Sequence, residues 1–360
     1  MTPHDTASRM TAWQVDPAGT RPGLRKLRLA VPIPAAGEVL VRLGAASLNY
    51  RDLLVSRGFY GATQRPVVAG SDGAGLIAAV GDGVDPARIG QRVAGAFFPD
   101  WTDGPVTAAR RARSLGAQLD GVLAEYVVLP AQAAIPVPDH LSDSEAATLP
   151  CAGLTAWHAV TAAGLQPGMT LLLQGAGGVS VMALLFARMA GLRVLQTAST
   201  ADKADRLRAL GAEHVLASGA GSDWATEILA LTGGLGADAV IDIGGPGSLA
   251  LSARAVRVGG TIVSVGFAGD GPGLDIRQIV GRAITLRGIT VGSCAMFADM
   301  NRAIAAARLR PVIHRRFSFD EVPEAYACLE AGGHVGKIVV EIADTEAGAA
   351  SSADNKGSEP

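Results

Sequence analysis

The chain has 360 residues, a length typical of two domains of about 150 residues each. Hydrophobic residues make up 49% of it, so a sizeable core can be buried, and 31 basic residues against 33 acidic ones leave no positive excess to attract nucleic acid. We therefore expect no nucleic-acid partner. The three cysteines, Cys151, Cys294 and Cys328, are widely spaced and odd in number, which argues against a disulfide framework and against a CxxC zinc motif.

The apolar segments argue against a membrane protein. The most apolar stretch, residues 179–192, contains Arg188 and is too short to span a bilayer. The first residues lack the apolar run after a basic start that is typical of a signal peptide. We expect a soluble, cytoplasmic protein that does not bind membranes.

Up to about residue 149 the chain alternates short strands with glycine-rich turns, a pattern typical of a β-rich, barrel-like domain. Residues 38–43 alternate apolar and polar side chains, which predicts a half-buried strand. Residues 101–119 break the pattern and carry three arginines, so we expect a surface excursion there. The predicted strands are residues 38–43, 67–70, 73–80 and 90–95.

From about residue 155 buried strands alternate with helices, which predicts a parallel sheet covered on both faces. The strands are residues 169–174, 193–197, 238–243 and 261–265, and the first two helices are residues 179–190 and 202–210. The chain then returns to mixed elements and closes with a strand at residues 337–341. Residues 344–360 lack bulky apolar side chains and are expected to form a disordered tail.

A glycine-rich turn, Gly175-Ala176-Gly177-Gly178, joins the first of these strands to its helix. Glycine permits a tight turn and a close approach of a pyrophosphate, and the helix N-terminus supplies free N–H groups and a partial positive charge. The last position of the usual fingerprint holds Ser180, which is still small. This placement predicts a dinucleotide site, with a turn of no such function as the alternative.

The end of the second strand predicts the kind of dinucleotide. A site for NAD expects an acid about 20 residues after the turn, where it binds the ribose 2′-hydroxyl. That position falls at Ala198, and Ser199 and Lys203 nearby are able to contact a 2′-phosphate, with Arg206 a further candidate. The pattern favours NADPH, although Asp202, interpreted as a first-turn helix stabiliser, leaves NADH open.

With these residues in place, the chain resembles the medium-chain dehydrogenase/reductase superfamily over residues 10–342. Besides the glycine turn, the motifs that carry the resemblance are residues 48–52 (LNYRD), 69–75 (AGSDGAG), 149–156 (LPCAGLTA), 209–215 (ALGAEHV) and 336–340 (GKIVV). The resemblance implies an α/β fold with a Rossmann domain inserted into a GroES-like, β-rich catalytic domain. The expected boundaries are residues 10–150 plus 290–343 for the GroES-like domain and 151–289 for the Rossmann domain.

The zinc positions of this superfamily are changed here. In zinc-dependent members a cysteine, a histidine and a second cysteine hold the catalytic metal, and the matching positions are Asn49, Ser71 and Cys151. One thiolate does not make a zinc site, which needs about three protein ligands. The structural zinc lobe is also missing, and residues 101–119 take its place. We therefore expect no metal, a buried Cys151, and a place in the zinc-free branch, which is similar to quinone oxidoreductases and enoyl reductases.

The resemblance also implies site residues. Asn49 and Thr155 match residues near the nicotinamide, and Tyr50 and Tyr60 match tyrosines proposed in some relatives for the pocket or for proton donation. Together Asn49, Tyr50 and Tyr60 are the expected catalytic residues. The expected cofactor contacts are Asn49, Thr155, Gly175, Gly177, Gly178, Val179, Ser199, Lys203, Gly244, Gly266, Phe267, Ser293 and Lys337.

The leading function is NADPH-dependent reduction of a quinone or an α,β-unsaturated carbonyl. A zinc-free alcohol dehydrogenase or ketoreductase of a biosynthetic pathway stays open, as does a non-catalytic NADPH-binding sensor. The aromatic patch at residues 97–101 is a hypothetical lining of the substrate site. A homodimer, formed through residues 283–289, is implied by the resemblance alone.

Overall fold

The computed structural model describes residues 8–16, 23–59, 65–219, 221–266, 271 and 273–342. The chain divides into two compact units, one made of Met1–Cys151 with Gly292–Pro360 and the other of Ala152–Val291. The first holds the mainly antiparallel sheets and the second a parallel sheet. The predicted α/β class, a parallel-sheet unit inserted into a β-rich one, is confirmed.

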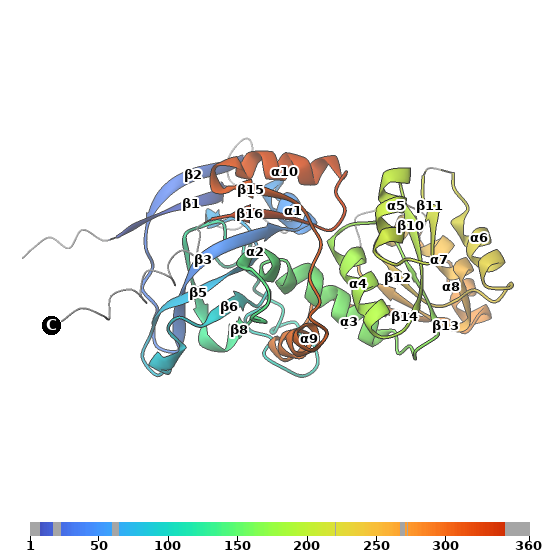
Figure 1. Ribbon diagram of the computed structural model, residues 1–360, viewed down its shortest axis with the longest axis horizontal. Coiled ribbons are helices and arrows are strands. Elements are labelled where there is room, and N and C mark those ends of the chain that lie inside the picture. Colours follow the sequence, from blue (N-terminus) through green and yellow to red (C-terminus); the bar gives the residue numbers. More distant parts are fainter. Residues whose placement is uncertain are drawn as a thin grey trace, which may run out of the picture. The chain divides into compact units, whose positions relative to one another are not determined.

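The main sheet of the first unit, within the described residues, follows the order β15-β16-β3-β5-β6-β8, with β7 also paired to β3 (Figure 1). A smaller sheet has the order β2-β1-β4. The strands are β1 (Arg9–Asp16), β2 (Gly23–Ala30), β3 (Glu38–Leu48), β4 (Val67–Val68), β5 (Asp72–Val80), β6 (Arg92–Gly95), β7 (Tyr126–Pro130), β8 (Ala134–Pro136), β15 (Ile313–Ser318) and β16 (Lys337–Glu341).

Strand β3 is the centre of this sheet. Strand β5 pairs with it along most of its length, β7 pairs with residues 38–42, and β16 pairs with residues 45–48. Within the predicted residues 38–43 the polar Glu38 and Arg42 are half-buried and the apolar side chains are buried, as expected. Residues 44–48, which lie beyond the prediction, are all buried and have no exposed face left to alternate.

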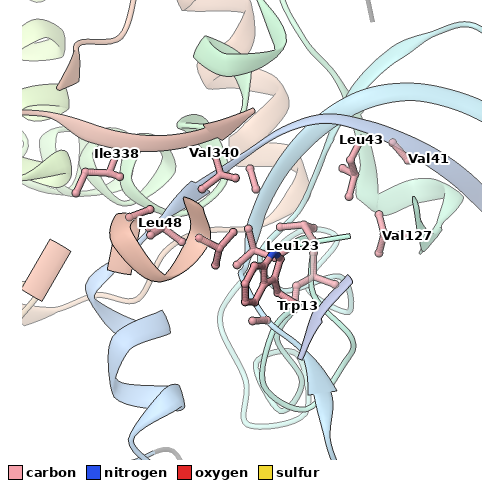
Figure 2. Packing of buried hydrophobic residues seen from close by; sticks show 14 of the residues in the cluster. Trp13, Val41, Leu43, Leu48, Leu123, Val127, Ile338 and Val340 are labelled. Carbon is pink, nitrogen blue, oxygen red and sulfur yellow. The ribbon is translucent and has the colours of Figure 1, made fainter. Parts of the chain in front are cut away.

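The core of the first unit joins segments from both ends of the chain. Figure 2 shows Trp13 packed beside Leu123, with Leu48 near Ile338 and Val340 of the closing strand. The Trp13 indole also donates a hydrogen bond of 2.8 Å to the Phe319 carbonyl oxygen, so the core tryptophan keeps a polar partner. The helices of this unit are α1 (Tyr50–Ser56), α2 (Asp143–Ala146), α9 (Cys294–Ala307) and α10 (Val322–Ala331).

The second unit, in its described part, has one parallel sheet of order β11-β10-β9-β12-β13-β14, the doubly wound order in which the chain reverses direction beside the first strand. Figure 1 shows α4 and α5 on one side of it and α6 and α7 on the other. The strands are β9 (Thr170–Leu173), β10 (Arg193–Ala198), β11 (His214–Ala217), β12 (Ala237–Asp242), β13 (Val256–Ser264) and β14 (Thr285–Gly288). The helices are α3 (Leu154–Ala162), α4 (Gly178–Met189), α5 (Ala201–Ala209), α6 (Trp224–Leu231), α7 (Leu249–Ala255) and α8 (Ile276–Gly281).

Among the described residues, no helix has the length and apolar character needed to cross a membrane. Three sequence predictions fall outside the described residues: the disordered tail at 344–360, and the site positions Tyr60 and Phe267.

Candidate active site

The glycine turn lies where it was predicted, between β9 and α4 in the second unit. Gly175 has φ of +72°, a left-handed conformation that side chains disfavour. Gly177 is the residue before α4, and a Cβ added to it would meet no atom within 4 Å. The turn therefore leaves open space at its helix N-terminus, as a bound pyrophosphate requires.

The side chain of Gln174 holds this turn to the next strand end. Its Nε2 donates to Asp242 Oδ2 at 3.0 Å and to Ser252 Oγ at 2.8 Å. Its Oε1 accepts from the N–H groups of Ile243 and Gly244, both at 3.3 Å. One buried amide thus connects the turn after β9 with the turn after β12.

Asp242 is the acceptor at the centre of this arrangement. It is fully buried, and besides Gln174 it accepts from the Gly245 N–H and from the hydroxyls of Ser248 and Ser252. A buried carboxylate is retained where such donors replace water. Neither Gln174 nor Asp242 was predicted from the sequence, although the polar ends of their apolar strands were a signal.

Strand β10 supports the turn from the other side. Gln196 Nε2 donates to the Gly175 carbonyl oxygen at 2.7 Å, and the Gly175 N–H donates to Thr197 Oγ1 at 3.3 Å. Ser180, the departure from the glycine fingerprint, is buried and donates from its hydroxyl to the Gln174 carbonyl oxygen at 2.6 Å. The hydroxyl closes the turn onto the strand before it, so the serine is compatible with the motif.

The predicted 2′-phosphate residues follow β10. Ala198 ends the strand, and Ser199 and Thr200 are exposed before α5. The Thr200 hydroxyl caps the helix by accepting from the Lys203 N–H, and the Lys203 ammonium donates to Ser199 Oγ at 3.4 Å. Asp202 is exposed in the first turn of α5, as a helix-stabilising acid would be. A serine hydroxyl and an ammonium therefore lie together at the end of the second strand.

Two further predicted positions lie at strand ends of the same sheet. Gly244 follows β12, and its N–H is one of those bound by Gln174. A Cβ added to Gly266 would lie 1.7 Å from the Ile243 carbonyl oxygen, so only glycine fits there. The backbones after β12 and β13 are in close contact for this reason.

In the first unit, three neighbouring strands bring the other predicted residues together. Ile338 of β16 pairs with Leu48 of β3, and Asp72 of β5 pairs with Ser47 of β3. This register places Lys337, Asn49 and Ser71 side by side, although they are far apart in sequence.

Hydrogen bonds connect these side chains into a continuous series. The Lys337 ammonium donates to Asn49 Oδ1 and to the Leu48 carbonyl oxygen. Asn49 Nδ2 donates to Ser71 Oγ at 3.2 Å, and Ser71 Oγ donates to Asp72 Oδ1 at 3.0 Å. The Cys151 N–H donates to Asp72 Oδ2 at 3.0 Å. The three positions aligned with zinc ligands are thus joined through Asp72 and Lys337.

Burial governs the ionisation of this cluster. It raises the pKa of Asp72, an effect that the Lys337 charge opposes. Cys151 was expected to be buried; the residue is half-buried, but its thiol is desolvated, which raises the thiol pKa with a further contribution from the Asp72 charge. This cysteine is therefore not an activated thiolate.

A second buried charge pair follows Asn49 directly. Asp52 Oδ2 accepts from the Asn49 N–H at 2.9 Å, and Arg51 donates to the Leu115 carbonyl oxygen at 2.7 Å and to Ser114 Oγ at 3.0 Å. Burial raises the pKa of Asp52 to about 6, against the lowering effect of the Arg51 charge. Among the described residues, Asp52 Oδ1 and the Tyr326 hydroxyl have no hydrogen-bond partner.

The remaining predicted residues are placed as follows. Tyr50 is the first residue of α1 and is 51% exposed, with its ring available to a ligand. Ser293 precedes α9, and its hydroxyl accepts from the Met296 N–H. Thr155 is buried in α3 of the second unit, so it and Asn49 belong to different units.

The segment 101–119 is a surface excursion only in part, so that prediction is half wrong. Arg110, Arg111 and Arg113 do lie on an exposed stretch, but Trp101 is 1% exposed and Leu115 is buried. The carbonyl oxygens of Trp101 and Thr102 accept from the N–H groups of Cys294 and Ala295, so the excursion caps α9. Its few apolar side chains were the signal that it packs inward.

The sequence matches two family models, "Alcohol dehydrogenase GroES-like domain" over residues 35–139 and "Zinc-binding dehydrogenase" over residues 178–307. It is 42% identical over 315 residues to a zinc-type alcohol dehydrogenase-like protein of Schizosaccharomyces pombe, covering 85% of this chain and 91% of the relative. It is 27% identical to an acryloyl-coenzyme A reductase of Metallosphaera sedula, covering 89% and 97%.

Among solved structures, it is similar to a putative alcohol dehydrogenase of Sinorhizobium meliloti, with a TM-score of 0.86 and 38% identity, covering 93% of this chain and 99% of that one. The parallel-sheet unit with its glycine turn is thus a Rossmann domain, and the β-rich unit is GroES-like. The chain belongs to the zinc-type medium-chain dehydrogenase/reductase superfamily and is a nicotinamide-dependent oxidoreductase. The predicted family is confirmed.

Proposed function

We propose that this chain is an NADPH-dependent reductase that reduces a quinone or an α,β-unsaturated carbonyl compound without zinc. One observation carries the proposal: the three positions aligned with zinc ligands hold Asn49, Ser71 and Cys151, and these are connected by hydrogen bonds that end on Lys337 and Asp72.

The donor set does not fit a catalytic zinc. An amide and a hydroxyl are weak zinc ligands, which leaves the Cys151 thiol as the single strong donor of the three, whereas a zinc site needs about three protein ligands. The Lys337 ammonium, bonded to Asn49, would repel a divalent cation. In the part of the chain that the structure describes, no group of three or more His, Cys, Asp or Glu side chains is arranged to hold a metal ion.

Without a metal, the favoured chemistry is hydride addition to a conjugated double bond. Alcohol oxidation needs a stabilised alkoxide, which zinc supplies as a Lewis acid. A conjugated carbonyl or quinone instead spreads the developing charge over its own oxygen, so hydrogen-bond donors and one proton donor suffice. Asn49 supplies an amide for the first task, and Tyr50 or Tyr60 a hydroxyl for the second.

The second unit fits NADPH, which would supply the hydride when bound. The turn at Gly175 and Gly177, open at Gly177, and the first two residues of α4, Gly178 and Val179, suit the pyrophosphate. Ser199 and Lys203 suit the 2′-phosphate, because an exposed hydroxyl and an ammonium replace the acid that NAD sites use. Thr155, Gly244, Gly266, Phe267 and Ser293 complete the proposed cofactor contacts. Lys337 is the one predicted contact that we do not propose, because its ammonium already donates to Asn49 Oδ1 and to the Leu48 carbonyl oxygen.

The relatives favour two substrate classes. The acryloyl-coenzyme A reductase favours an activated C=C bond, and the relatives named alcohol dehydrogenases keep a zinc-free alcohol dehydrogenase or ketoreductase as the second candidate. The weak donors Asn49 and Ser71 and the position of the Lys337 ammonium favour the first, because they leave no metal site that would stabilise an alkoxide.

We further propose a cytoplasmic homodimer joined through β14. This strand lies at an edge of the parallel sheet in the described residues, and all four of its residues are exposed. Val280 and Ile276 of α8, which precedes β14, are also exposed, at 75% and 68%. An edge strand beside apolar side chains is suited to pairing with a second copy. Light scattering that gave the mass of a single chain would contradict this.

The function is tested by following NADPH oxidation across quinones, enones, enoyl thioesters and ketones, with NADH in parallel. We expect turnover with enones or quinones, and a preference for NADPH that falls about tenfold in Ser199→Ala/Lys203→Ala, the cost of about one charge-assisted contact. Equal use of NADH would contradict the 2′-phosphate proposal. Stoichiometric zinc in the purified protein would contradict the zinc-free site, and tight NADPH binding without turnover would favour a sensor.

A further inference from the structure

The orientation of the Asn49 amide is determined by its neighbours. Lysine has three N–H donors and no acceptor, so the Asn49 atom that faces the Lys337 ammonium must be the carbonyl oxygen. The amide nitrogen must then face Ser71, whose oxygen lies 3.2 Å away. Asparagine oxygen and nitrogen are interchangeable in shape, so this neighbour decides between two orientations that would otherwise be equivalent.

The hydrogen bonds at the other end of this series of side chains, at Asp72, have the same direction. Ser71 accepts from Asn49, so its single proton is available for Asp72 Oδ1 at 3.0 Å. Asp72 also accepts the Cys151 N–H at 3.0 Å, which suits a carboxylate that only accepts. A donor-only ammonium at one end and an acceptor-only carboxylate at the other make every hydrogen bond run from Lys337 towards Asp72.

Lys337 reaches this position from the far end of the sequence, and its position is rigid. The preceding Gly336 has φ of +84°, and a Cβ there would lie 2.3 Å from the Val312 carbonyl oxygen. The side chain is 3% exposed, and its ammonium is also bonded to the Leu48 carbonyl oxygen at 2.6 Å. Burying a lysine is costly, so a site that keeps it satisfied indicates a specific use.

We propose that Lys337 is a positioning residue that fixes the Asn49 amide in the one orientation in which it serves the reaction. This rests on the proposed function, in which Asn49 contacts the reacting groups. Without Lys337 the Asn49 amide would be free to flip, which would exchange the positions of its oxygen and its nitrogen. A hydrogen-bond acceptor would then stand where the donor stood, and a donor where the acceptor stood. The alternative is that Lys337 only neutralises the buried Asp72 carboxylate, or contacts the cofactor directly.

The effect of Lys337 on the Asn49 amide can be measured without any substrate. The chain contains three asparagines, Asn49, Asn301 and Asn355, so selective ¹⁵N-asparagine labelling gives three side-chain amide signal pairs. The Asn49 pair is identified by its loss in Asn49→Ser. We expect this pair to shift or broaden in Lys337→Met and to stay unchanged in Lys26→Met, a lysine that pairs with Asp320 on the surface. An unchanged Asn49 pair in Lys337→Met would overturn the proposal.

Kinetics distinguish positioning from the two alternatives. For Lys337→Met we expect kcat/KM to fall about tenfold, less than the loss of a whole oxyanion donor, with the Kd of NADPH within about twofold. The double variant Lys337→Met/Asp72→Asn guards against unfolding, because it removes both charges. We expect it to recover Tm but not activity. Recovery of both would mean that Lys337 only balances Asp72, and a Kd that rises as steeply as kcat/KM falls would mean a direct cofactor contact.

The two proposals fail separately. If the wild-type protein turns over no enone or quinone, the proposed function fails, while the Asn49 signals still decide whether Lys337 orients the amide. If turnover is found and the Asn49 pair does not respond to Lys337→Met, the function stands and the positioning role fails.

Discussion

The candidate residues of the two units are supported in opposite ways. In the second unit the glycine turn is held by neutral amides and hydroxyls around one carboxylate, Asp242. In the first unit the Asn49 cluster depends on buried ions of both signs, with Lys337 and Arg51 beside Asp72 and Asp52. A turn suited to binding a ligand through backbone N–H groups depends on its backbone conformation. The cluster at the positions aligned with zinc ligands depends instead on buried charges that neutralise one another.

The largest effect expected from this difference is at Asp242. All of its partners donate, so Asp242→Asn would set an amide N–H against other donors and cost about 2–4 kcal/mol of unfolding free energy, with weaker NADPH binding through Gln174. Urea unfolding and NADPH titration measure both. The control Asp205→Asn removes an exposed pair with Arg208 and should cost less than about 1 kcal/mol. An unfolding midpoint equal to that of the wild type would show that the turn is not held through this carboxylate.

The next effect concerns pH and the first unit. Burial raises the pKa of Asp52 from 3.8 to about 6, so between these values the folded chain holds a proton that the unfolded chain has lost. Its contribution to stability is therefore full below pH 3.8 and is lost as pH rises through about 6, by at most about 3 kcal/mol. In Asp52→Asn this dependence should vanish. Parallel stability curves for the two proteins from pH 4 to 7 would show that Asp52 does not titrate with folding.

The smallest effect separates two roles of glycine within the turn, which are to adopt a left-handed backbone conformation and to leave space for a ligand. Gly175→Ala places a side chain at φ of +72° and should cost about 1 kcal/mol of stability. Gly177→Ala has room for its Cβ in the free protein, so Tm should stay the same while NADPH binding weakens, because the methyl group occupies space that the pyrophosphate needs. If both variants lose stability equally, the space at Gly177 is not kept open for a ligand.

The sequence predicted the parts of the site that are local. The glycine turn, the strand before it and the helix after it are consecutive residues, and their pattern alone predicts a dinucleotide turn. The family and fold followed from motifs spread along the chain. The side chains that hold the turn, Gln174 and Asp242, could not be predicted from such motifs, because they meet only through the pairing of β9 with β12.

The Asn49 cluster shows the same limit more strongly. Lys337 reaches Leu48 across 289 residues. The family motifs implied that Lys337 and Asn49 both lie near the cofactor, but nothing in them predicted the hydrogen bond between the two side chains. The burial of Trp101 was missed for a similar reason: the carbonyl oxygens that cap α9 come from a segment whose composition resembles a surface loop. Register between distant strands, rather than composition, decides such contacts.

The pairing of β16 with β3 also has a consequence for how the protein is made. Residues 45–48 leave the ribosome long before the strand that pairs with them, Lys337–Glu341. The continuous segment Ala152–Val291 contains all the strands described for its sheet and can fold while translation continues. The unit that begins first is therefore completed last, and until then the β3 edge that β16 will cover is unpaired and open to wrong partners on the nascent chain.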